Sequence, residues 1–262
     1  MHPKPKKSLG QNFLIDENII NLIVEVGDVK NNDIVIEVGP GTGNLTEKII
    51  LKRPKKLILI EKDKTLVEKL NNRFKENITL LNKDILKVEE EDFKDDKMIF
   101  FGNLPYNISS QLLVKWIRKH NLNSMCKKMI LMFQKEVADR ILAKTNHRDY
   151  GRLSILSSWK LNITKIKDIN PGSFYPAPKI KSTILLLEPK SNFFNIKNPK
   201  NLEHVTNIFF SQKRKMINKP LKILFKDIDI ISKKFDLDLT KRPQNLDPMV
   251  YFNLCKEYED LN

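Results

Sequence analysis

An apolar run in the middle of the chain ends in residues that could act on an amine. Residues 98–101 predict a buried strand, which stops at Asn103, Leu104, Pro105 and Tyr106. Asn103 offers a side-chain carbonyl, Pro105 favours an extended Leu104 with its carbonyl directed outward, and Tyr106 adds a flat ring. Two acceptors beside a stacking surface suit a planar ring with an exocyclic NH2, because accepting both N–H bonds draws the nitrogen toward a tetrahedral, nucleophilic form. The alternative is an ordinary β-turn that uses Asn and Pro.

A glycine-rich turn follows an earlier predicted strand. Residues 34–38 are apolar apart from Glu37, and glycines occupy every second position from Gly39 to Gly43 before a helical pattern begins at Asn44. Such a turn lets the backbone approach a ligand closely with unpaired N–H groups. The order G-x-G-x-G departs from the dinucleotide fingerprint, whose third glycine would fall at Asn44. Glu37 also suits a cationic ligand better than a pyrophosphate.

Three successive predicted strands end in a carboxylate or an amide. Glu61 follows the run 57–60, Asp84 follows the strand at 78–81, and Asn103 follows the strand described above. Open α/β sheets bind ligands beyond the carboxyl ends of their strands. Glu61 could accept from both hydroxyls of a ribose, and Asp84 could accept from an adenine amine. Asp is common after any strand, so the prediction of an adenosine-binding site rests on the whole series together with the glycine turn.

Composition limits the classes of protein and partner. The 262 residues carry a formal charge of +15 with a pI near 9.6, which indicates a polyanionic partner, either nucleic acid or an acidic membrane surface. Lysine greatly outnumbers arginine, so we assign part of this charge to compositional bias. Two cysteines and four scattered histidines predict neither a disulfide framework nor a metal site. Without a signal-like or membrane-length apolar segment, we expect a soluble, cytoplasmic protein.

Two further segments could cover a ligand. Gln11, Asn12 and Phe13 would have to fold over it, and the alternative is a disordered basic leader before a helix capped by Asp16. The proline-containing loop at 173–182 presents Phe174 and Tyr175 ahead of a predicted strand at 183–187. Its prolines restrict the loop, as a stacking site requires.

Strand patterns stop near residue 190, and short helical patterns follow. We therefore expect a catalytic domain at 1–190 and a helical domain at 191–262. Between these helical patterns lie Lys213, Arg214 and Lys215, followed by two more lysines at helical spacing. Clustered on one helix, these side chains would contact phosphates by charge, without base specificity. The alternative is a solvated helix face in a lysine-rich protein.

An adenosine-bearing, cationic ligand beside an amine-activating turn describes methyl transfer from S-adenosylmethionine to nitrogen. At this point the sequence resembles the small-subunit ribosomal RNA adenine dimethyltransferases, the family of the bacterial kasugamycin-sensitivity methylase. The segments that carry the resemblance are Gln11-Asn12-Phe13-Leu14, Glu37-Val38-Gly39-Pro40-Gly41-Thr42-Gly43, Glu61, Asp84-Ile85, Asn103-Leu104-Pro105-Tyr106-Asn107-Ile108-Ser109, Asp149-Tyr150-Gly151-Arg152-Leu153-Ser154 and Phe174-Tyr175-Pro176-Ala177-Pro178-Lys179.

The resemblance implies a fold, a reaction and a set of residues. The fold would be α/β, a Rossmann-like methyltransferase sheet with a small all-helical C-terminal domain. The reaction would be two successive methylations on N6 of two adjacent adenines near the 3′ end of small-subunit (16S) RNA, on a late pre-30S particle and by a monomer. The implied cofactor-binding residues are Asn12, the backbone at Leu14, Gly39, Glu61, Asp84 and Asn103. Asn103 and the Leu104 carbonyl would take the amine, with Tyr106 and Phe174 stacking on the flipped-out adenine.

Two positions depart from the family pattern, and three rival functions remain. Gln111 stands where proline is expected, and Lys213 stands where a second arginine is usual. The second departure could alter RNA affinity, because lysine lacks the forked geometry of arginine. The rivals are the related large-subunit adenine methylation of macrolide resistance, protein glutamine methylation, and a ribosome assembly factor in which binding matters more than turnover.

Overall fold

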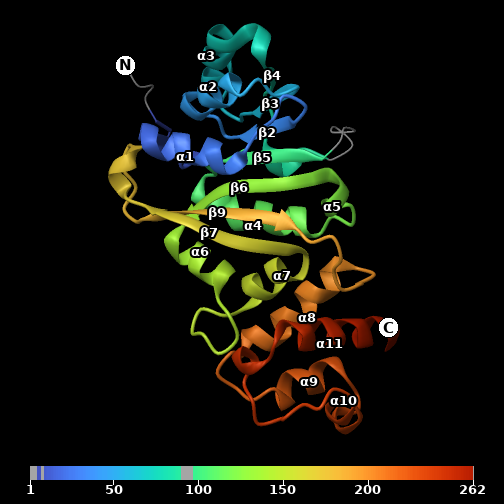
Figure 1. Cartoon of the computed structure of the whole chain (residues 1–262). Helices are drawn as coiled ribbons and strands as arrows, with labels where there is room; N and C mark the ends of the chain where they lie inside the picture. The colour runs from blue at the N-terminus through green and yellow to red at the C-terminus, as the bar shows by residue number, and fades with distance from the viewer. Residues whose placement is uncertain (1–4, 7–8, 90–96, 262) are drawn as a thin grey trace. The chain divides into compact units, whose positions relative to one another are not determined.

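The structure is a computed structural model that describes residues 5–6, 9–89 and 97–261 (Figure 1). The chain divides into two compact units. One comprises the described residues of 1–115 with 121–138 and 162–189, and the other comprises 116–120, 139–161 and 190–262. The second unit therefore contains the expected helical domain together with two earlier segments. The assignment of catalysis to residues 1–190 and of RNA binding to 191–262 stays a prediction.

A seven-stranded sheet in the order β4-β3-β2-β5-β6-β9-β7 runs through the first unit. Its strands are β2 (Ile34–Val38), β3 (Lys56–Ile60), β4 (Thr79–Leu81), β5 (Met98–Gly102), β6 (Cys126–Gln134), β7 (Leu161–Ile169) and β9 (Ser182–Pro189). The strands from β4 to β6 are parallel, and β9 is antiparallel to β6. In this register Val38 lies beside Ile60 and Gly102, so three strands end at the same level. The predicted α/β sheet is confirmed, and β7 is an addition to the predicted strands.

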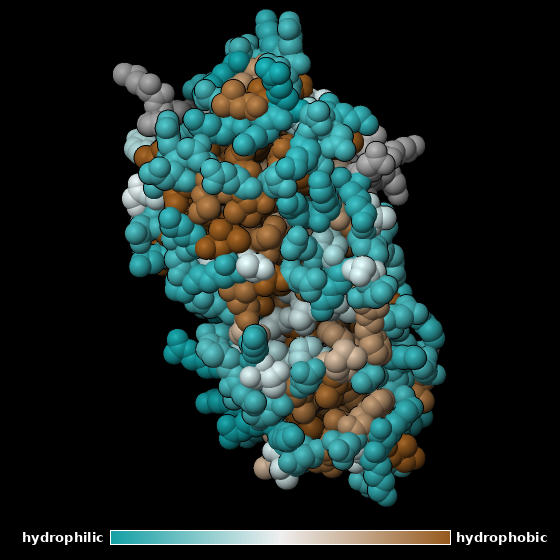
Figure 2. Space-filling model, in the orientation of Figure 1, coloured by the Kyte–Doolittle hydropathy of each residue, from teal (hydrophilic) through white to brown (hydrophobic). Residues whose placement is uncertain are grey.

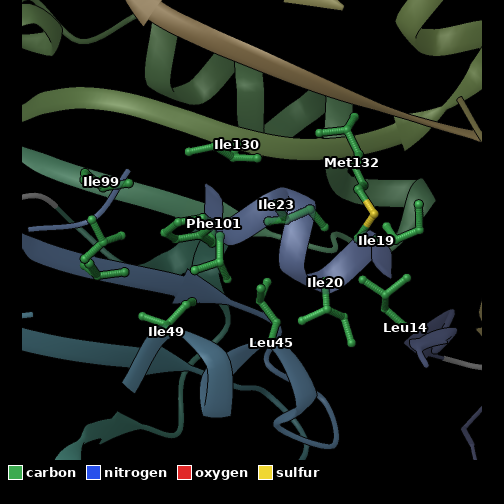
Figure 3. Close-up of a cluster of buried hydrophobic side chains, with 14 of the residues drawn as sticks. Leu14, Ile19, Ile20, Ile23, Leu45, Ile49, Ile99, Phe101, Ile130 and Met132 are labelled. Atoms are coloured by element: carbon green, nitrogen blue, oxygen red, sulfur yellow. The ribbon is translucent and has the colours of Figure 1, made fainter. Parts of the chain in front are cut away.

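Helices cover this sheet, and the first of them shows how the sequence determines the packing. The helices of the first unit are α1 (Glu17–Gly27), α2 (Asn44–Leu51), α3 (Lys64–Phe74), α4 (Tyr106–Ile117), α5 (Leu122–Met125) and α6 (Lys135–Leu142), the last residues of α4 and α6 belonging to the second unit. Asp16 caps α1 as predicted, by accepting from the N–H groups of Asn18 and Ile19. The apolar face of α1 packs on β5 and β6 (Figure 3). A Cβ on Gly27 would come within 2.3 Å of the Phe101 ring, so this close approach requires glycine.

Two short strands join the segments that were expected to cover a ligand. Strand β1 (Phe13–Leu14) pairs antiparallel with β8 (Phe174–Tyr175), with Leu14 opposite Phe174. Both segments are therefore ordered against each other, which contradicts a disordered leader at residues 13–14. Helix α4 begins at Tyr106, so Tyr106 lies on the first turn of a helix.

The second unit is helical apart from its loops and the start of β7. Its main helices are α7 (Arg152–Lys160), α8 (Pro199–Ser211), α9 (Asn218–Leu224), α10 (Ile228–Lys234) and α11 (Pro248–Leu261). Lys160 is buried here, with Nζ 4.3 Å from the ring centroid of Trp159 and 2.7 Å from the carbonyl oxygen of Lys119. Desolvation lowers the pKa of Lys160 to about 8. The Trp159 indole donates to the carbonyl of Phe194 at 2.7 Å, which fixes the other edge of the ring.

The basic segment does not lie on a helix, contrary to prediction. Lys213, Arg214 and Lys215 lie in the turn between α8 and α9, while Lys219 and Lys222 lie on α9. The helical pattern of α8 ends at Ser211, so the cationic side chains project from a connection rather than from one face.

The surface view in Figure 2 is mostly hydrophilic, with apolar patches between the charged side chains. Among the described residues, none of the helices has the length and apolar character needed to cross a membrane. The same part of the chain contains no group of three or more His, Cys, Asp or Glu side chains that could hold a metal ion.

Candidate active site

A pocket opens in the first unit, where β3, β2 and β5 end. Residues 9–14, 37–42, 44–45, 60–62, 66, 83–85, 103–106 and 108 line it. All six predicted cofactor-binding residues are among them: Asn12, Leu14, Gly39, Glu61, Asp84 and Asn103. Leu104 and Tyr106 line the same pocket. Their functional roles stay predictions, but the fold brings these eight residues to one edge of the sheet.

The glycine turn has the backbone conformation that requires glycine. Gly39 and Gly41 have φ angles of 67° and 59°, in the left-handed region. The N–H of Gly39 donates to the Ile60 carbonyl at 2.9 Å, which ties the turn to β3. A Cβ on Gly41 would lie 2.9 Å from the Phe13 ring. The turn therefore depends on glycine both for its conformation and for the approach of Phe13.

Glu61 is positioned by main-chain groups. Only 8% of the residue is exposed, and Oε1 accepts from the N–H of Asp63 at 2.9 Å while Oε2 accepts from that of Gly41 at 3.4 Å. Burial raises the pKa of Glu61, and the backbone hydrogen bonds oppose this shift. A carboxylate has about four acceptor positions, so two bonds to N–H groups leave capacity for the two hydroxyls of a ribose.

Asp84 lies beyond β4 at the start of a 3-10 turn, Ile85–Lys87. Its Oδ1 accepts from the N–H of Leu86 at 3.0 Å, and its Oδ2 accepts from Lys62 Nζ at 2.9 Å. Burial alone would raise the pKa of Asp84, but the bonds from Lys62 and Leu86 outweigh it and lower the pKa. The side chain is therefore an ionised acceptor at neutral pH, as a contact with an adenine amine would require.

Glu37 forms the floor of the pocket behind the glycine turn. It is 2% exposed, and Oε2 accepts from the hydroxyl of Thr46 at 2.7 Å. Burial raises the pKa of Glu37 to about 8, against the hydrogen bond from Thr46 and with a smaller contribution from the charge of Glu61. At pH 7 this carboxyl is therefore mainly protonated. A cation in the pocket would favour its ionised form. The suitability of Glu37 for a cationic ligand stays a prediction.

The side-chain amide of Asn103 is oriented by a hydrogen bond to the main chain. Its Nδ2 donates to the carbonyl oxygen of Asn12 at 2.9 Å, so Oδ1 is the acceptor that the side chain offers to a ligand. The ring of Tyr106 is held through its hydroxyl, which lies 2.7 Å from the hydroxyl oxygen of Ser182. Burial raises the pKa of Tyr106, so the ring is a neutral phenol at neutral pH.

Phe174 is the one predicted catalytic residue that does not line this pocket. It is 3% exposed and belongs to the hydrophobic cluster that includes Leu14 and Ile169. Its neighbour Tyr175 is 44% exposed. The structure therefore brings Asn103, Leu104 and Tyr106 together and leaves the Phe174 ring in the core. The stacking role of Phe174 stays a prediction.

Sequence reasoning missed three residues that shape the pocket. Asn44 Nδ2 donates to the Leu14 carbonyl at 2.9 Å, so it holds the N-terminal segment beside α2. Thr46 holds Glu37, and Asp63 holds Glu61 through its main-chain N–H. Of the three, only Asn44 stood out in the sequence, because it occupies the position where the dinucleotide-binding fingerprint has its third glycine.

The site and the fold together define a class of protein. Parallel strands of the sheet are followed by a left-handed glycine turn on one strand, a buried carboxylate on the next, and an amide-bearing loop on the third, all around one pocket. These features fit S-adenosylmethionine and are those of the methyltransferases that use it. Residues 2–260 match the family described as "Ribosomal RNA adenine dimethylase", and the chain belongs to this family.

Curated relatives carry consistent names. The chain is 55% identical over 261 residues to "Ribosomal RNA small subunit methyltransferase A" of Pelagibacter ubique (strain HTCC1062), covering 100% of this chain and 99% of that protein. It is 38% identical over 258 residues to the protein of the same name in Malacoplasma penetrans (strain HF-2), covering 97% of this chain and 92% of that protein. The predicted family, the enzyme class and the use of S-adenosylmethionine are confirmed.

Solved structures agree with the fold. A dimethyladenosine transferase from Plasmodium falciparum matches with a TM-score of 0.79 at 28% identity, covering 95% of this chain and 98% of that one. The 23S rRNA methyltransferase ErmE matches with a TM-score of 0.70 at 21% identity, covering 95% of this chain and 100% of that one. At that identity the second match indicates the fold alone. The predicted Rossmann-like methyltransferase fold is confirmed.

Proposed function

We propose that the chain dimethylates N6 of two adjacent adenines near the 3′ end of small-subunit ribosomal RNA. The observation that carries the proposal is the oriented amide of Asn103, whose Nδ2 is committed to Asn12 while Oδ1 stays an acceptor at the edge of the pocket. The names of the relatives favour the small subunit over the large subunit. We further propose that the substrate is a pre-30S particle and that the enzyme acts in the cytoplasm as a monomer.

Some residues of the pocket hold the cofactor, and others activate the target amine. Glu61 and Asp84 hold the adenosine part of the cofactor, which when bound supplies an electrophilic methyl group. Asn103 Oδ1 and the Leu104 carbonyl accept from the two N–H bonds of the target amine, so the nitrogen lone pair is no longer delocalised into the ring. The target adenine leaves its stack and lies on Tyr106, whose hydroxyl is fixed by Ser182. No strong base is needed before attack.

RNA binding is assigned to the second unit. Arg214 and Lys215 are exposed in the turn between α8 and α9, where they can contact phosphates. Lys213 is half-buried, and its Nζ donates to the carbonyl oxygen of Arg148. We therefore propose phosphate contacts for Arg214 and Lys215, with Lys213 mainly positioning the turn.

The decisive experiment supplies methyl-labelled S-adenosylmethionine with unmodified small subunits, large subunits and free RNA, and locates dimethyladenine by mass spectrometry. The expected result is label on two adjacent adenines of the small-subunit RNA. Label on a large-subunit adenine would establish the macrolide-resistance type of reaction instead. Binding to small subunits without label, under conditions where the cofactor binds, would establish an assembly factor.

A further inference from the structure

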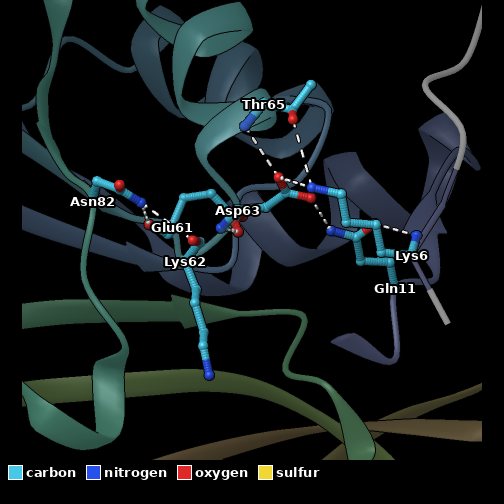
Figure 4. A network of polar contacts seen from close by, with 7 residues as sticks. All are labelled: Lys6, Gln11, Glu61, Lys62, Asp63, Thr65 and Asn82. Atoms are coloured by element: carbon cyan, nitrogen blue, oxygen red, sulfur yellow. Dashed lines mark hydrogen bonds and ion pairs between the residues drawn. The ribbon is translucent and has the colours of Figure 1, made fainter. Parts of the chain in front are cut away.

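Asp63 lies two residues beyond Glu61 and joins several parts of the first unit (Figure 4). Its carboxylate is buried, with Oδ1 accepting from Lys6 Nζ at 2.6 Å and from the N–H of Thr65 at 3.0 Å. Its Oδ2 accepts from Gln11 Nε2 at 2.9 Å. The main-chain N–H of the same residue donates to Glu61 Oε1 at 2.9 Å. One residue thus binds the N-terminal segment through its side chain and the ribose-type carboxylate through its backbone.

The network around Asp63 fixes each donor and acceptor. The main-chain N–H of Lys6 donates to Gln11 Oε1 at 2.7 Å, so the Gln11 amide is held at both ends. Burial alone would raise the pKa of Asp63, but the hydrogen bonds from Lys6 and Gln11 outweigh it and lower the pKa. Asp63 also caps α3, which fixes the start of that helix. The carboxylate is therefore ionised and rigidly placed.

Residues 9–14, here called the strap, cross the pocket between two anchors. At the β3 side Gln11 binds Asp63, and at the β5 side the Asn12 carbonyl accepts from Asn103. Because β2 lies between β3 and β5 in the sheet, the strap passes over the glycine turn, where the Phe13 ring approaches Gly41. All six strap residues line the pocket.

We propose that Asp63 is a positioning residue that couples closure of the strap to the orientation of Glu61, and so retains the bound cofactor. The coupling is direct, because the side chain and the main-chain N–H of one helix-capping residue make the two sets of contacts. A cofactor held by Glu61 therefore lies under a strap that is tied to the same residue. This inference rests on the proposed function for the identity of the ligand.

The test exchanges donor and acceptor across the Gln11–Asp63 contact. Gln11→Glu places two carboxylates against each other, and Asp63→Asn places two amides against each other. Each single variant should release S-adenosylmethionine about ten times faster than the wild type, since a charge-assisted hydrogen bond is lost and replaced by repulsion. The double variant Gln11→Glu/Asp63→Asn restores a complementary pair with the roles reversed, and should return to within about threefold of the wild type. Asn caps helices as well as Asp does, so α3 keeps its start.

The readouts separate a strap effect from a general loss of structure. Stopped-flow displacement gives the cofactor release rate, and hydrogen exchange should rise in a peptide covering the strap and fall again in the double variant. The KM for the cofactor should rise in the single variants with kcat within about threefold. Gln111→Glu on the exposed face of α4 makes the same charge change away from the pocket and should behave as the wild type. The milder Lys6→Met keeps the Gln11 contact and should accelerate release about threefold.

Two results would overturn the inference. One is wild-type release from both single variants, and the other is a double variant no slower than the faster single variant. If the wild type itself binds neither S-adenosylmethionine nor its demethylated product, the proposed function fails instead. Folding is monitored by circular dichroism, and if a single variant at Gln11 or Asp63 unfolds, Lys6→Met decides: release at the wild-type rate overturns the coupling.

Discussion

The pocket residues of the first unit and the basic turn of the second unit hold their polar side chains in opposite ways. Asn103 and Glu61 in the pocket, and Asp63 beside it, each make hydrogen bonds of 2.9–3.4 Å with main-chain or amide groups, and each bond has a defined direction. In the turn, Arg214 and Lys215 are exposed. Chemistry on one nitrogen needs fixed acceptors, whereas attraction to phosphates needs only charge at the surface. The comparison predicts that substitutions in the pocket act on catalysis or cofactor binding, and that substitutions in the turn act on salt-dependent affinity.

The largest effect is expected at Asn103. Asn103→Ala removes the acceptor and should lower kcat by about 10³-fold, the magnitude for loss of a preorganised polar group at the reacting centre. Binding of the small-subunit particle, measured by filter retention or sedimentation, should stay within about threefold. Methyl transfer at the normal rate would show that Asn103 does not activate the amine. It would also contradict the expectation that substitutions in the pocket act on catalysis.

A smaller effect is expected at Glu61. Glu61→Gln should weaken cofactor binding about 10- to 100-fold, because a charged acceptor for ribose is replaced and an NH2 group faces backbone donors. Isothermal titration calorimetry measures the dissociation constant of S-adenosylmethionine for each variant. The matched control is Glu47→Gln, which removes an exposed carboxylate paired with Arg73 outside the pocket. Equal affinities for the two variants would exclude Glu61 as the ribose ligand.

The buried carboxyl of Glu37 should make the stability of the protein depend on pH. Its pKa is about 8 in the fold and near 4.3 in an unfolded chain, so between these values the folded protein binds the additional proton. The stability of the cofactor-free protein should therefore fall as pH rises from about 5 to 8. Glu37→Gln removes this pH dependence. Between pH 5 and pH 8 the unfolding free energy of the variant should therefore rise relative to that of the wild type by on the order of a few kcal/mol, and its Tm should rise relative to the wild-type Tm. A Tm difference that is the same at pH 5 and pH 8 would contradict the assignment.

The smallest effect is expected in the turn. Arg214→Gln/Lys215→Gln should reduce the salt slope of particle binding by about 1.5 to 2, one phosphate contact for each charge. Lys165→Gln/Lys167→Gln on β7 removes the same charge elsewhere and should leave the slope unchanged. Lys213→Gln should change the slope less than Lys215→Gln, because Lys213 is engaged by the Arg148 carbonyl. An unchanged slope in the first variant would leave the turn as a solvated surface.

The same contrast explains what could be predicted from the sequence. Strand periodicity predicted the sheet, and the residues just beyond strand ends predicted Glu61, Asp84 and Asn103 at one site, because parallel strands necessarily place their carboxyl ends together. Asn12 and Leu14 were predicted as cofactor-binding residues only from the family resemblance. The apolar pattern of a buried strand could not predict β7. This strand lies at the edge of the sheet, where exposed positions accommodate Lys165 and Lys167. Phe174 was expected at the pocket from its type and loop, but burial depends on the long-range pairing of β8 with β1.

The sequence could not predict contacts between segments that are distant along the chain. Asp63 follows a strand like many loop aspartates, and nothing near it in sequence indicates that Lys6 and Gln11 bind it. The basic turn was expected on a helix because lysine spacing fits one, whereas α8 ends before it. Residue types thus predicted the reacting groups, while the residues that hold them in place required the structure.

The buried indole of Trp159 gives the molecule an optical reporter. The chain has two tryptophans, Trp116 and Trp159, and both belong to the second unit. Tryptophan fluorescence therefore reports on denaturation of the second unit, while far-ultraviolet circular dichroism reports on both units. Since the cofactor pocket belongs to the first unit, added S-adenosylmethionine should raise the fluorescence midpoint only if the two units unfold as one cooperative block.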